Sequence, residues 1–191
     1  MTSRALMPVS ITQQVLIHVP GYACEIADQL EDWARTSVRF CSETVSLFGR
    51  AVAVPREVAW FGEPGWRYAY SGTPHVATGW PAALDKLRHQ LYCDHGYQPD
   101  FVLLNRYRDG KDSMGWHADD EPETRGLVAS FSIGATRTLR WRRGRSGSSH
   151  ALRLAHGDLL VHDRGLYHAV PKTRRPVGER LNLSFRQLLA P

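Results

Sequence analysis

The sequence predicts an α+β fold in which two helices are followed by a jelly roll or a related β-barrel. Two segments in the first half of the 191-residue chain have helical periodicity. About eight short segments follow them, in which polar and apolar residues alternate or most residues are apolar. Helices followed by a run of strands are typical of the α+β class. The length is that of one domain, so residues 1–191 are expected to form a single unit.

The two helices are expected at residues 22–38 and at about 81–97. In the first, apolar residues recur at helical spacing, with acidic residues early and arginine late, which indicates an amphipathic helix. The second starts with Pro81 in its first turn and stops at Gly96, and both residue types favour those positions. Residues 1–20 are uninformative and are treated as an N-terminal extension.

The strands are expected in a core at about residues 100–188. The expected strands are short segments in which polar and apolar residues alternate or most residues are apolar. They are separated by turn-forming residues such as Arg108-Asp109-Gly110. The expected ranges are 101–107, 115–119, 128–134, 137–142, 151–155, 158–162, 166–171 and 180–188.

The net charge of +5 is distributed unevenly. Residues 137–191 contain twelve Lys or Arg and three acidic residues, whereas residues 1–136 contain twelve basic and sixteen acidic residues. A basic C-terminal part indicates a polyanionic partner. The apolar runs are far shorter than the roughly 20 residues that span a bilayer, so no membrane partner is expected. Three cysteines without a Cys-x-x-Cys pair argue against a disulfide framework and favour a reducing compartment.

An H-x-D pattern, His117 and Asp119, lies in one expected strand. Alternate residues of a strand project to the same side, so both side chains can reach one metal ion, and His168 from a later strand can complete the set. Two imidazoles and one carboxylate leave three positions of an iron open, as in non-haem Fe(II) oxygenases. With nine histidines in the chain the pattern alone is weak, and His162 is an alternative third ligand.

The last expected strand, 180–188, has a polar face made of Arg180, Asn182, Ser184 and Arg186. If this face lies inside a barrel, the two guanidinium groups need anions, because an unpaired buried charge is very costly. A dicarboxylate would supply these anions. The alternative is an edge strand with a solvated basic face, and the alternation alone favours that alternative.

Six ordered motifs carry a resemblance to a known family. They are Asn105-x-Tyr107-x-x-Gly110, His117-x-Asp119-Asp120-Glu121, Ser130-x-Ser132-x-Gly134-x-x-Arg137, His156-Gly157-Asp158-Leu159-Leu160, His168-x-x-Pro171 and Arg180-x-Asn182-x-Ser184-x-Arg186. On these motifs the sequence resembles the AlkB family of Fe(II)- and 2-oxoglutarate-dependent dioxygenases, and most of all its branch that repairs double-stranded DNA. The resemblance implies a double-stranded β-helix (jelly-roll) core with the N-terminal helices packed on the outside.

The resemblance also implies Fe(II), the cosubstrate 2-oxoglutarate and O2. His117, Asp119 and His168 would be the iron ligands and catalytic residues, and His162 falls where the family more often has Met. Arg180 would pair with the distal carboxylate of 2-oxoglutarate, and Arg186 would lie beside its metal-chelating end and beside Asp119. The implied cosubstrate residues are Asn105, Tyr107, Arg180, Asn182 and Arg186.

The implied reaction is oxidative demethylation of N-alkylated bases in DNA, such as 1-methyladenine and 3-methylcytosine, coupled to decarboxylation of 2-oxoglutarate to succinate. Alkylated DNA, with duplex preferred and single-stranded DNA as an alternative, would be the partner of a monomer in a bacterial cytoplasm or a eukaryotic nucleus. The alternatives are a 2-oxoglutarate oxygenase acting on RNA or another substrate, and a non-catalytic jelly-roll module that binds nucleic acid.

Recognition of the nucleotide is expected in a segment at about 45–75. Phe48 with the adjoining Arg56 resembles the wedge that fills the stack when a base is flipped out, although one Phe on a Gly-containing loop is more often a packing residue. The base pocket would be lined by Tyr68, Tyr70, Ser71 and Glu121. Two basic stretches are either solvated faces or phosphate contacts, and their candidate residues are Arg142, Arg143, Lys172, Arg174 and Arg175.

Overall fold

The computed structural model describes residues 15–47, 50–70 and 73–189, with only the backbone described at 45–47, 50–52, 70 and 73. The elements in chain order are β1 (Leu16–Val19), α1 (Cys24–Ser37), β2 (Cys41–Leu47), β3 (Arg50–Gly62), β4 (Arg67–Tyr70), β5 (Thr73–Val76), the 3-10 helix η1 (Ala82–Leu84), α2 (Asp85–His95), β6 (Phe101–Tyr107), β7 (Met114–His117), β8 (Thr124–Gly134), β9 (Arg137–Arg142), β10 (His150–Leu154), β11 (Asp158–Asp163), β12 (Tyr167–Val170) and β13 (Arg180–Leu188).

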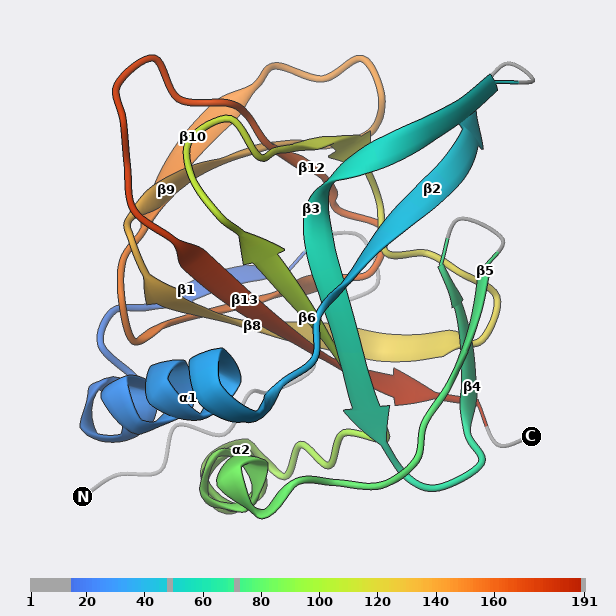
Figure 1. The fold of residues 1–191 in the computed structure, drawn as a ribbon, viewed down its shortest axis with the longest axis vertical. Helices are drawn as coiled ribbons and strands as arrows, with labels where there is room; N and C mark the ends of the chain where they lie inside the picture. Colours follow the sequence, from blue (N-terminus) through green and yellow to red (C-terminus); the bar gives the residue numbers. More distant parts are fainter. Residues whose placement is uncertain (1–14, 48–49, 71–72, 190–191) are drawn as a thin grey trace.

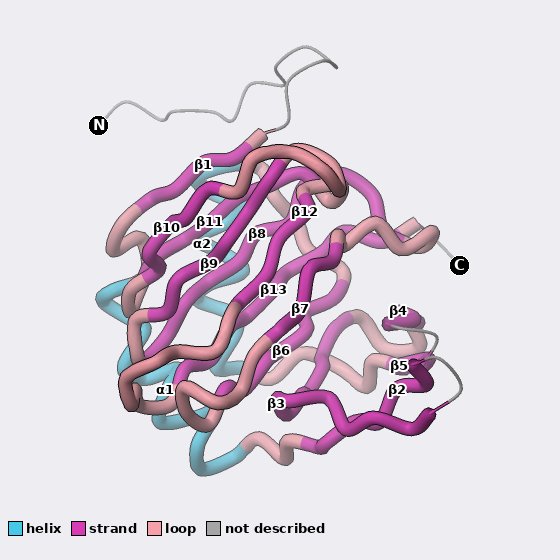
Figure 2. The backbone as a smooth tube through the Cα atoms, turned by 90° about the horizontal axis from the view of Figure 1, so that it is seen from above, coloured by secondary structure: helices cyan, strands magenta, loops and turns pink. Residues whose placement is uncertain are grey.

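Two antiparallel sheets form the two layers of the fold (Figure 2). The larger has seven strands in the order β1-β11-β8-β13-β6-β3-β2, the smaller has four in the order β10-β9-β12-β7, and β4 and β5 form a separate hairpin. The helices α1 and α2 lie on the outside of the larger sheet (Figures 1 and 2). The expected α+β fold, a jelly-roll core with helices packed outside it, is confirmed.

Both expected helices are present. α1 buries a stripe of alanine and leucine side chains against the larger sheet. The second expected helix is a 3-10 turn followed by α2, with Pro81 directly before the turn. Gly96 ends α2 with a φ of 62°, a left-handed conformation that glycine adopts without a steric penalty.

The central position of β13 explains its alternating sequence. It pairs with β8 on one side and with β6 on the other, so the edge-strand alternative is wrong. Leu181, Leu183 and Phe185 pack into the apolar cluster shared with the helices. The opposite face of the strand lies in the interior between the two sheets and consists of the four polar residues Arg180, Asn182, Ser184 and Arg186, none more than 8% exposed.

Five strands, β1 to β5, were not predicted, so the order of two helices and then eight strands is wrong. The eight expected strands are β6 to β13, with ends within four residues of the predicted ones. β1 is only four residues long, and β2 is largely polar. β3 contains Pro55, which the register places opposite the irregularity between Ser42 and Thr44, where no regular ladder bond is required of it. Tertiary pairing, of β1 with β11 and of β3 with β6, therefore decides these strands.

The composition predicted no membrane-spanning segment and no disulfide framework. Within residues 15–47, 50–70 and 73–189, neither helix has the length and apolarity needed to cross a bilayer. Cys24, Cys41 and Cys93 are all free thiols, which agrees with the prediction that the chain lacks a disulfide framework.

Replacement of Gly157 by Ala should destabilise the protein more than the same replacement at Gly144. Both glycines have a left-handed φ, of 82° and 69°, but a Cβ at Gly157 would lie 2.7 Å from Cys24 Sγ and 3.0 Å from Cys24 N, whereas at Gly144 nothing lies within 4 Å. We expect the free energy of unfolding to fall by about 1–2 kcal/mol at Gly144 and by about 2–4 kcal/mol at Gly157. Urea denaturation measures both, and equal losses would contradict a tight approach of α1 to this turn.

Candidate metal and cosubstrate site

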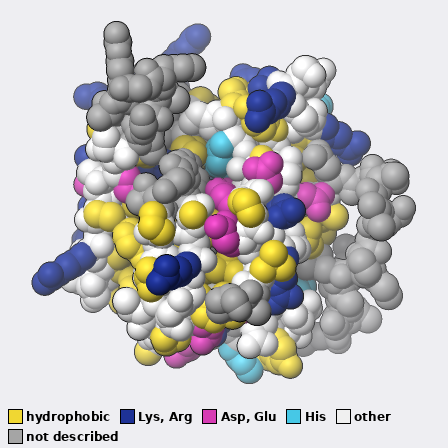
Figure 3. Space-filling view, turned by 90° about the vertical axis from the view of Figure 1, so that its right-hand side faces the viewer, with side chains coloured by type: hydrophobic (Ala, Val, Ile, Leu, Met, Phe, Trp, Pro, Cys, Tyr) yellow, Lys and Arg dark blue, Asp and Glu magenta, His cyan; other side chains and the backbone are white. Residues whose placement is uncertain are grey.

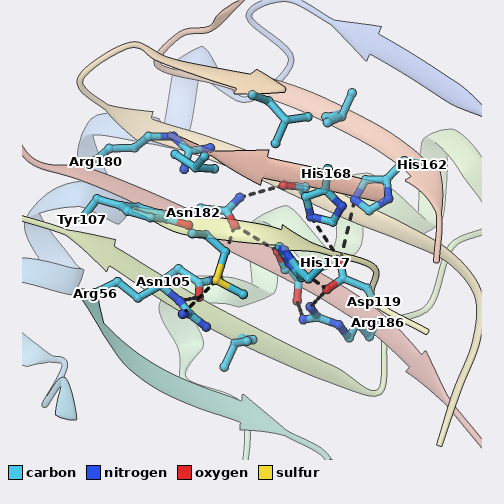
Figure 4. A pocket seen from close by; sticks show the side chains of 17 residues that line it. Arg56, Asn105, Tyr107, His117, Asp119, His162, His168, Arg180, Asn182 and Arg186 are labelled. Carbon is cyan, nitrogen blue, oxygen red and sulfur yellow. Dashed lines mark hydrogen bonds and ion pairs between the residues drawn. The ribbon is translucent and has the colours of Figure 1, made fainter. Parts of the chain in front are cut away.

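A pocket between the two sheets brings together most of the predicted metal and cosubstrate residues (Figure 4). β3, β6, β8, β11 and β13 form one wall, and β7, β9 and β12 form the other. Its polar lining residues are Arg56, Asn105, Tyr107, His117, Asp119, Ser130, His162, His168, Arg180, Asn182, Ser184 and Arg186.

The three predicted metal ligands converge at one end of this pocket. His117 on β7 pairs directly with His168 on β12, and their rings are 4.2 Å apart. His117 Nε2 lies 3.7 Å from Asp119 Oδ1, and His168 Nε2 lies 3.9 Å from Asp119 Oδ2. One ligand atom from each residue lies within 4.8 Å of the other two, which is close enough for a shared metal ion.

The prediction that Asp119 lies in one strand with His117 is wrong. β7 ends at His117, so Asp119 does not share a strand face with it. Asp119 lies in the following loop, where its backbone N–H donates to the carbonyl of Arg164 at 2.8 Å. The Arg164 guanidinium also donates to the carbonyl of Thr124, the first residue of β8. Arg164 was not predicted as a site residue, because it falls in a turn whose tertiary contact leaves no sequence signal.

The two predicted histidine ligands are held in the same tautomer. His117 Nδ1 lies 2.9 Å from the carbonyl of Gly115, and His168 Nδ1 lies 2.9 Å from that of Leu166. A carbonyl accepts only, so each Nδ1 carries the proton and each Nε2 presents its lone pair toward Asp119. Desolvation also lowers the pKa of His117 to about 3, which keeps this ring neutral at physiological pH.

A buried ion pair fixes the charge of Asp119. Desolvation alone would raise the pKa of this carboxyl, but the Arg186 guanidinium outweighs burial and holds the pKa far below its usual range. Arg186 Nη2 donates to Asp119 Oδ1 at 2.9 Å, and Nη1 donates to the carbonyl of Ser184. The predicted placement of Arg186 beside Asp119 is confirmed. The carboxylate is thus an anion held between a guanidinium and the pocket histidines.

The other end of the pocket is cationic (Figure 4). Arg180 is 2% exposed and donates from Nη2 to Ser132 Oγ at 2.9 Å. Its Nε and Nη1 have no hydrogen-bond partner among the described residues. Its guanidinium lies 5.4 Å from the centre of the Tyr107 ring, and desolvation lowers its pKa to about 10. Arg180 is therefore still charged at neutral pH and presents two free donors to an anion.

Two asparagines and Arg56 connect the ends of the pocket. Asn182 Nδ2 donates to Ser130 Oγ at 2.7 Å and to the carbonyl of Phe131 at 3.1 Å. Asn182 Oδ1 accepts from Asn105 Nδ2 at 3.4 Å. Arg56 Nε donates to Asn105 Oδ1 at 2.6 Å. The Asn182 amide is occupied by protein groups, which suits a role in positioning Asn105, and Arg56 lies in the pocket wall.

Ser130, which lines the pocket, and Ser132, which accepts from Arg180, were not predicted as site residues, although they stood in a quoted motif. They alternate with apolar residues along β8, as the polar residues do along β13, and the register sets Ser132 opposite Asn182 and Ser130 opposite Ser184. The matching alternation of the two segments was a sequence signal for this shared polar face.

Two of the predicted base-binding residues, Tyr68 and Glu121, lie near the metal end. Tyr68 is buried against Phe101, and the Arg186 guanidinium lies 4.9 Å from the centre of its ring. Desolvation, together with the charge of Asp119, raises the pKa of Glu121. The backbone of Tyr70 ends β4, but its side chain, together with Phe48 and Ser71, lies outside the described residues.

The predicted phosphate contacts lie on two surface segments. The Arg142 guanidinium lies over two parallel rings, 4.3 Å from Trp116 and 4.8 Å from Tyr167. Arg143 is exposed in the turn after β9. The remaining exposed residues, in the segment between β12 and β13, are Lys172, Arg174 and Arg175.

The pocket chemistry fits a metal ion and a keto acid. Two Nε2 lone pairs and a carboxylate at one end match the ligands of a non-haem iron, and the donor set leaves positions open. The two unpartnered nitrogens of Arg180 at the other end, Nε and Nη1, match a carboxylate. A jelly roll with this two-histidine, one-carboxylate pocket defines the class of metal-dependent oxygenases to which the fold and site point.

The family comparison identifies the chain more narrowly. Residues 15–186 match the model of the 2OG-Fe(II) oxygenase superfamily, and the chain belongs to this superfamily. DNA oxidative demethylase ALKBH2 of Homo sapiens is 36% identical over 159 residues, covering 76% of this chain and 61% of that protein. Alpha-ketoglutarate-dependent dioxygenase alkB homolog 3 of Rattus norvegicus is 33% identical over 150 residues, covering 69% and 50%. These similarities confirm the resemblance to the AlkB family.

The relatives are longer proteins than this chain. The aligned part spans 57–66% of the length of three mammalian ALKBH2 proteins. A solved structure described as that of OsALKBH1 superposes with a TM-score of 0.63 at 15% identity and covers 93% of this chain and 100% of that one. At this identity the superposition supports the fold.

The metal-free protein should lose stability as the pH falls from about 6.5 to about 4. Unfolded His117 and His162 take up protons near pH 6.5, whereas desolvation lowers their folded pKa values to about 3 and about 4. The unfolded state binds more protons in this window, so each histidine contributes a slope of up to about 1.4 kcal/mol per pH unit. Urea denaturation in chelator at a series of pH values measures it. His117→Gln combined with His162→Gln should flatten the profile, and an unchanged slope in that variant would contradict the assignment.

Proposed function

We propose that this chain is an Fe(II)- and 2-oxoglutarate-dependent dioxygenase that removes alkyl groups from N-alkylated bases in DNA. The observation that carries the proposal is the cluster of His117, Asp119 and His168 at one end of a pocket whose other end is the free guanidinium edge of Arg180. The curated relatives named DNA oxidative demethylase support the reaction and the substrate.

Different residues of the pocket bind the iron and the 2-oxoglutarate. His117, Asp119 and His168 hold the iron, while the Arg186 ion pair keeps Asp119 ionised and oriented. Arg180 and Tyr107 hold the distal carboxylate of 2-oxoglutarate, Asn105 donates to the cosubstrate, and Asn182 keeps Asn105 in place. Bound iron would supply the oxidation of the alkyl carbon by O2, coupled to the decarboxylation of 2-oxoglutarate to succinate and CO2.

The charges around the site suit a cationic base on a polyanionic strand. Asp and Glu side chains gather near the middle of one face, next to a His, and Lys and Arg side chains surround them (Figure 3). Glu121, in the loop that carries Asp119, faces a positively charged alkylated ring, with Tyr68 and Tyr70 as further walls of the base pocket. Arg142, Arg143, Lys172, Arg174 and Arg175 contact phosphates, and duplex DNA is the preferred form.

The purified protein with Fe(II), ascorbate and 2-oxoglutarate should convert 1-methyladenine in an oligonucleotide to adenine and release succinate. Asp119→Ala should reduce both products to background, because it removes one iron ligand. Asp120→Ala, at the exposed neighbouring position, is the matched control and should retain activity. Chromatography of the digested oligonucleotide and a succinate assay give the two readings. An intact methyl group, with iron shown bound, would refute the proposed activity.

Arg180→Gln should raise the KM for 2-oxoglutarate by roughly 10- to 100-fold, since a charge-assisted hydrogen-bonded contact contributes about 1.5–3 kcal/mol. The KM for methylated DNA should not change. Arg153→Gln, at an exposed position on β10, is the control. A rise confined to the DNA substrate would show that Arg180 does not bind the keto acid.

Phe48→Ala should reduce the repair of duplex DNA at least about tenfold more than the repair of single-stranded DNA. A wedge fills the space left by a flipped base, and this unstacking costs a few kcal/mol in a duplex only. Initial rates on the same lesion in both substrates test this. Equal losses would exclude the wedge role.

A further inference from the structure

Arg137, the first residue of β9, is a buried arginine that does not line the pocket and has no part in the proposed function. It is 2% exposed. Its Nη1 donates to the carbonyl of Asp109 at 3.0 Å, and its Nη2 donates to the carbonyls of Asp112 and Pro171, both at 2.8 Å. These acceptors lie in the loop between β6 and β7 and directly after β12. One side chain of β9 therefore joins two segments that are far apart in the sequence.

Arg137 also lies against the cosubstrate end of the pocket. Its guanidinium lies 5.5 Å from the centre of the Tyr107 ring, and the Arg180 guanidinium lies 5.4 Å from the same centre. Tyr107 on β6 pairs directly with Arg180 on β13. Because a cation is attracted to the face of an aromatic ring, both guanidinium groups hold the Tyr107 ring. Arg137 therefore acts on the candidate carboxylate-binding group through Tyr107.

The loop that Arg137 binds also holds the basic segment, residues 171–175, which follows β12. Thr173 N donates to the carbonyl of Gly110 at 2.8 Å. A Cβ at Gly110 would overlap the Thr173 side chain, so the loop and the basic segment are in close contact. The basic segment carries three of the proposed phosphate contacts, Lys172, Arg174 and Arg175. The position of these contacts therefore depends on the loop that Arg137 fixes.

Positioning explains the burial of Arg137 better than stability does. Desolvation of a guanidinium offsets much of what its hydrogen bonds contribute, and the three acceptors here are uncharged carbonyls. A planar guanidinium, however, has donors at fixed angles and sets the relative position of the groups that it binds. At 2% exposure the side chain does not reach a keto acid or a phosphate itself. Any effect of Arg137 on either ligand must therefore act through its neighbours.

We propose that Arg137 is a positioning residue for both ligands of the protein. Through Tyr107 it orients Arg180 toward the keto acid. Through the loop between β6 and β7 it places the basic segment against the DNA backbone. The inference rests on the proposed function, because it takes 2-oxoglutarate and DNA as the ligands. Loss of the Arg137 side chain should weaken the binding of each ligand in the absence of the other.

Arg137→Gln should raise the Kd for 2-oxoglutarate roughly 10-fold, measured by calorimetry with Mn²⁺ in place of iron and without DNA. It should also weaken the binding of an unmodified duplex, measured by fluorescence anisotropy at several salt concentrations without 2-oxoglutarate. Each phosphate contact contributes about 0.9 to the slope of log K against log salt, so displacement of the basic segment should reduce this slope by roughly one to two. A role in stability alone would leave the slope and both Kd values of the folded protein unchanged.

Two further variants separate geometry from charge. Arg106→Gln is the matched control, because the Arg106 guanidinium binds Glu57 and Glu179 and contacts neither the loop nor the basic segment. It removes the same charge and should keep the native Kd for 2-oxoglutarate and the native salt slope. Arg137→Lys keeps the charge but lacks the planar guanidinium, so it should behave as Arg137→Gln does.

A folded Arg137→Gln protein with a native salt slope or a native Kd for 2-oxoglutarate would overturn the joint role. Gly110→Ala tests the DNA contact separately, because displacement of Thr173 should reduce the slope and leave the Kd for 2-oxoglutarate unchanged. If neither Arg137 variant folds, an unchanged slope in Gly110→Ala overturns the inference. If Arg180→Gln binds 2-oxoglutarate as tightly as the native protein does, the cosubstrate site of the proposed function fails as well. If Arg180→Gln loses binding while Arg137→Gln does not, only the role of Arg137 fails.

Discussion

The ion pair between Arg186 and Asp119 is the contact on which the site depends. Asp119 is 2% exposed and lies in a loop, so no strand fixes its side chain and water does not solvate its charge. A buried carboxylate is stable only with a charged, hydrogen-bonded partner. The 2.9 Å contact with Arg186 provides that partner and leaves the second carboxylate oxygen facing His162 and His168. The site thus presents electron-pair donors toward its centre, while the Arg186 guanidinium compensates the charge of Asp119 from the opposite side.

The layered arrangement of the fold explains how the polar groups of β13 can be buried. The helices cover one face of the larger sheet, so the apolar side chains of β13 lie in a core and its polar side chains must lie between the sheets. β13 is flanked on both sides, by β8 and β6, whose serines and asparagines satisfy many of its polar groups. The buried donors of β13 that have no partner among the described residues, Nε and Nη1 of Arg180 and Nε of Arg186, are therefore the ones available to a ligand.

The two ends of the pocket have opposite chemical requirements. At one end, the Arg180 guanidinium has nitrogens without hydrogen-bond acceptors among the described residues. At the other end, the histidines and Asp119 offer electron pairs that could bind a metal ion. A keto acid with a carboxylate at each end and a metal ion satisfy both together. The hydrogen-bonded line from Arg56 through Asn105 to Asn182 keeps the space between them polar and ordered. Because one end of the pocket suits an anion and the other a cation, the metal and the cosubstrate belong to one site.

The sequence by itself determined the fold class, β6 to β13, both helices and the polar face of β13, because alternation and turn residues are local signals. It also singled out His117, Asp119, His168, Arg180 and Arg186 through ordered motifs. Only the tertiary structure decided the rest. β1 to β5 depend on partner strands, Asp119 is placed by a loop contact with Arg164, and His162 is as close to Asp119 as His168 is. Such features arise from groups distant in the chain, whose contacts exist only once the sheets have paired.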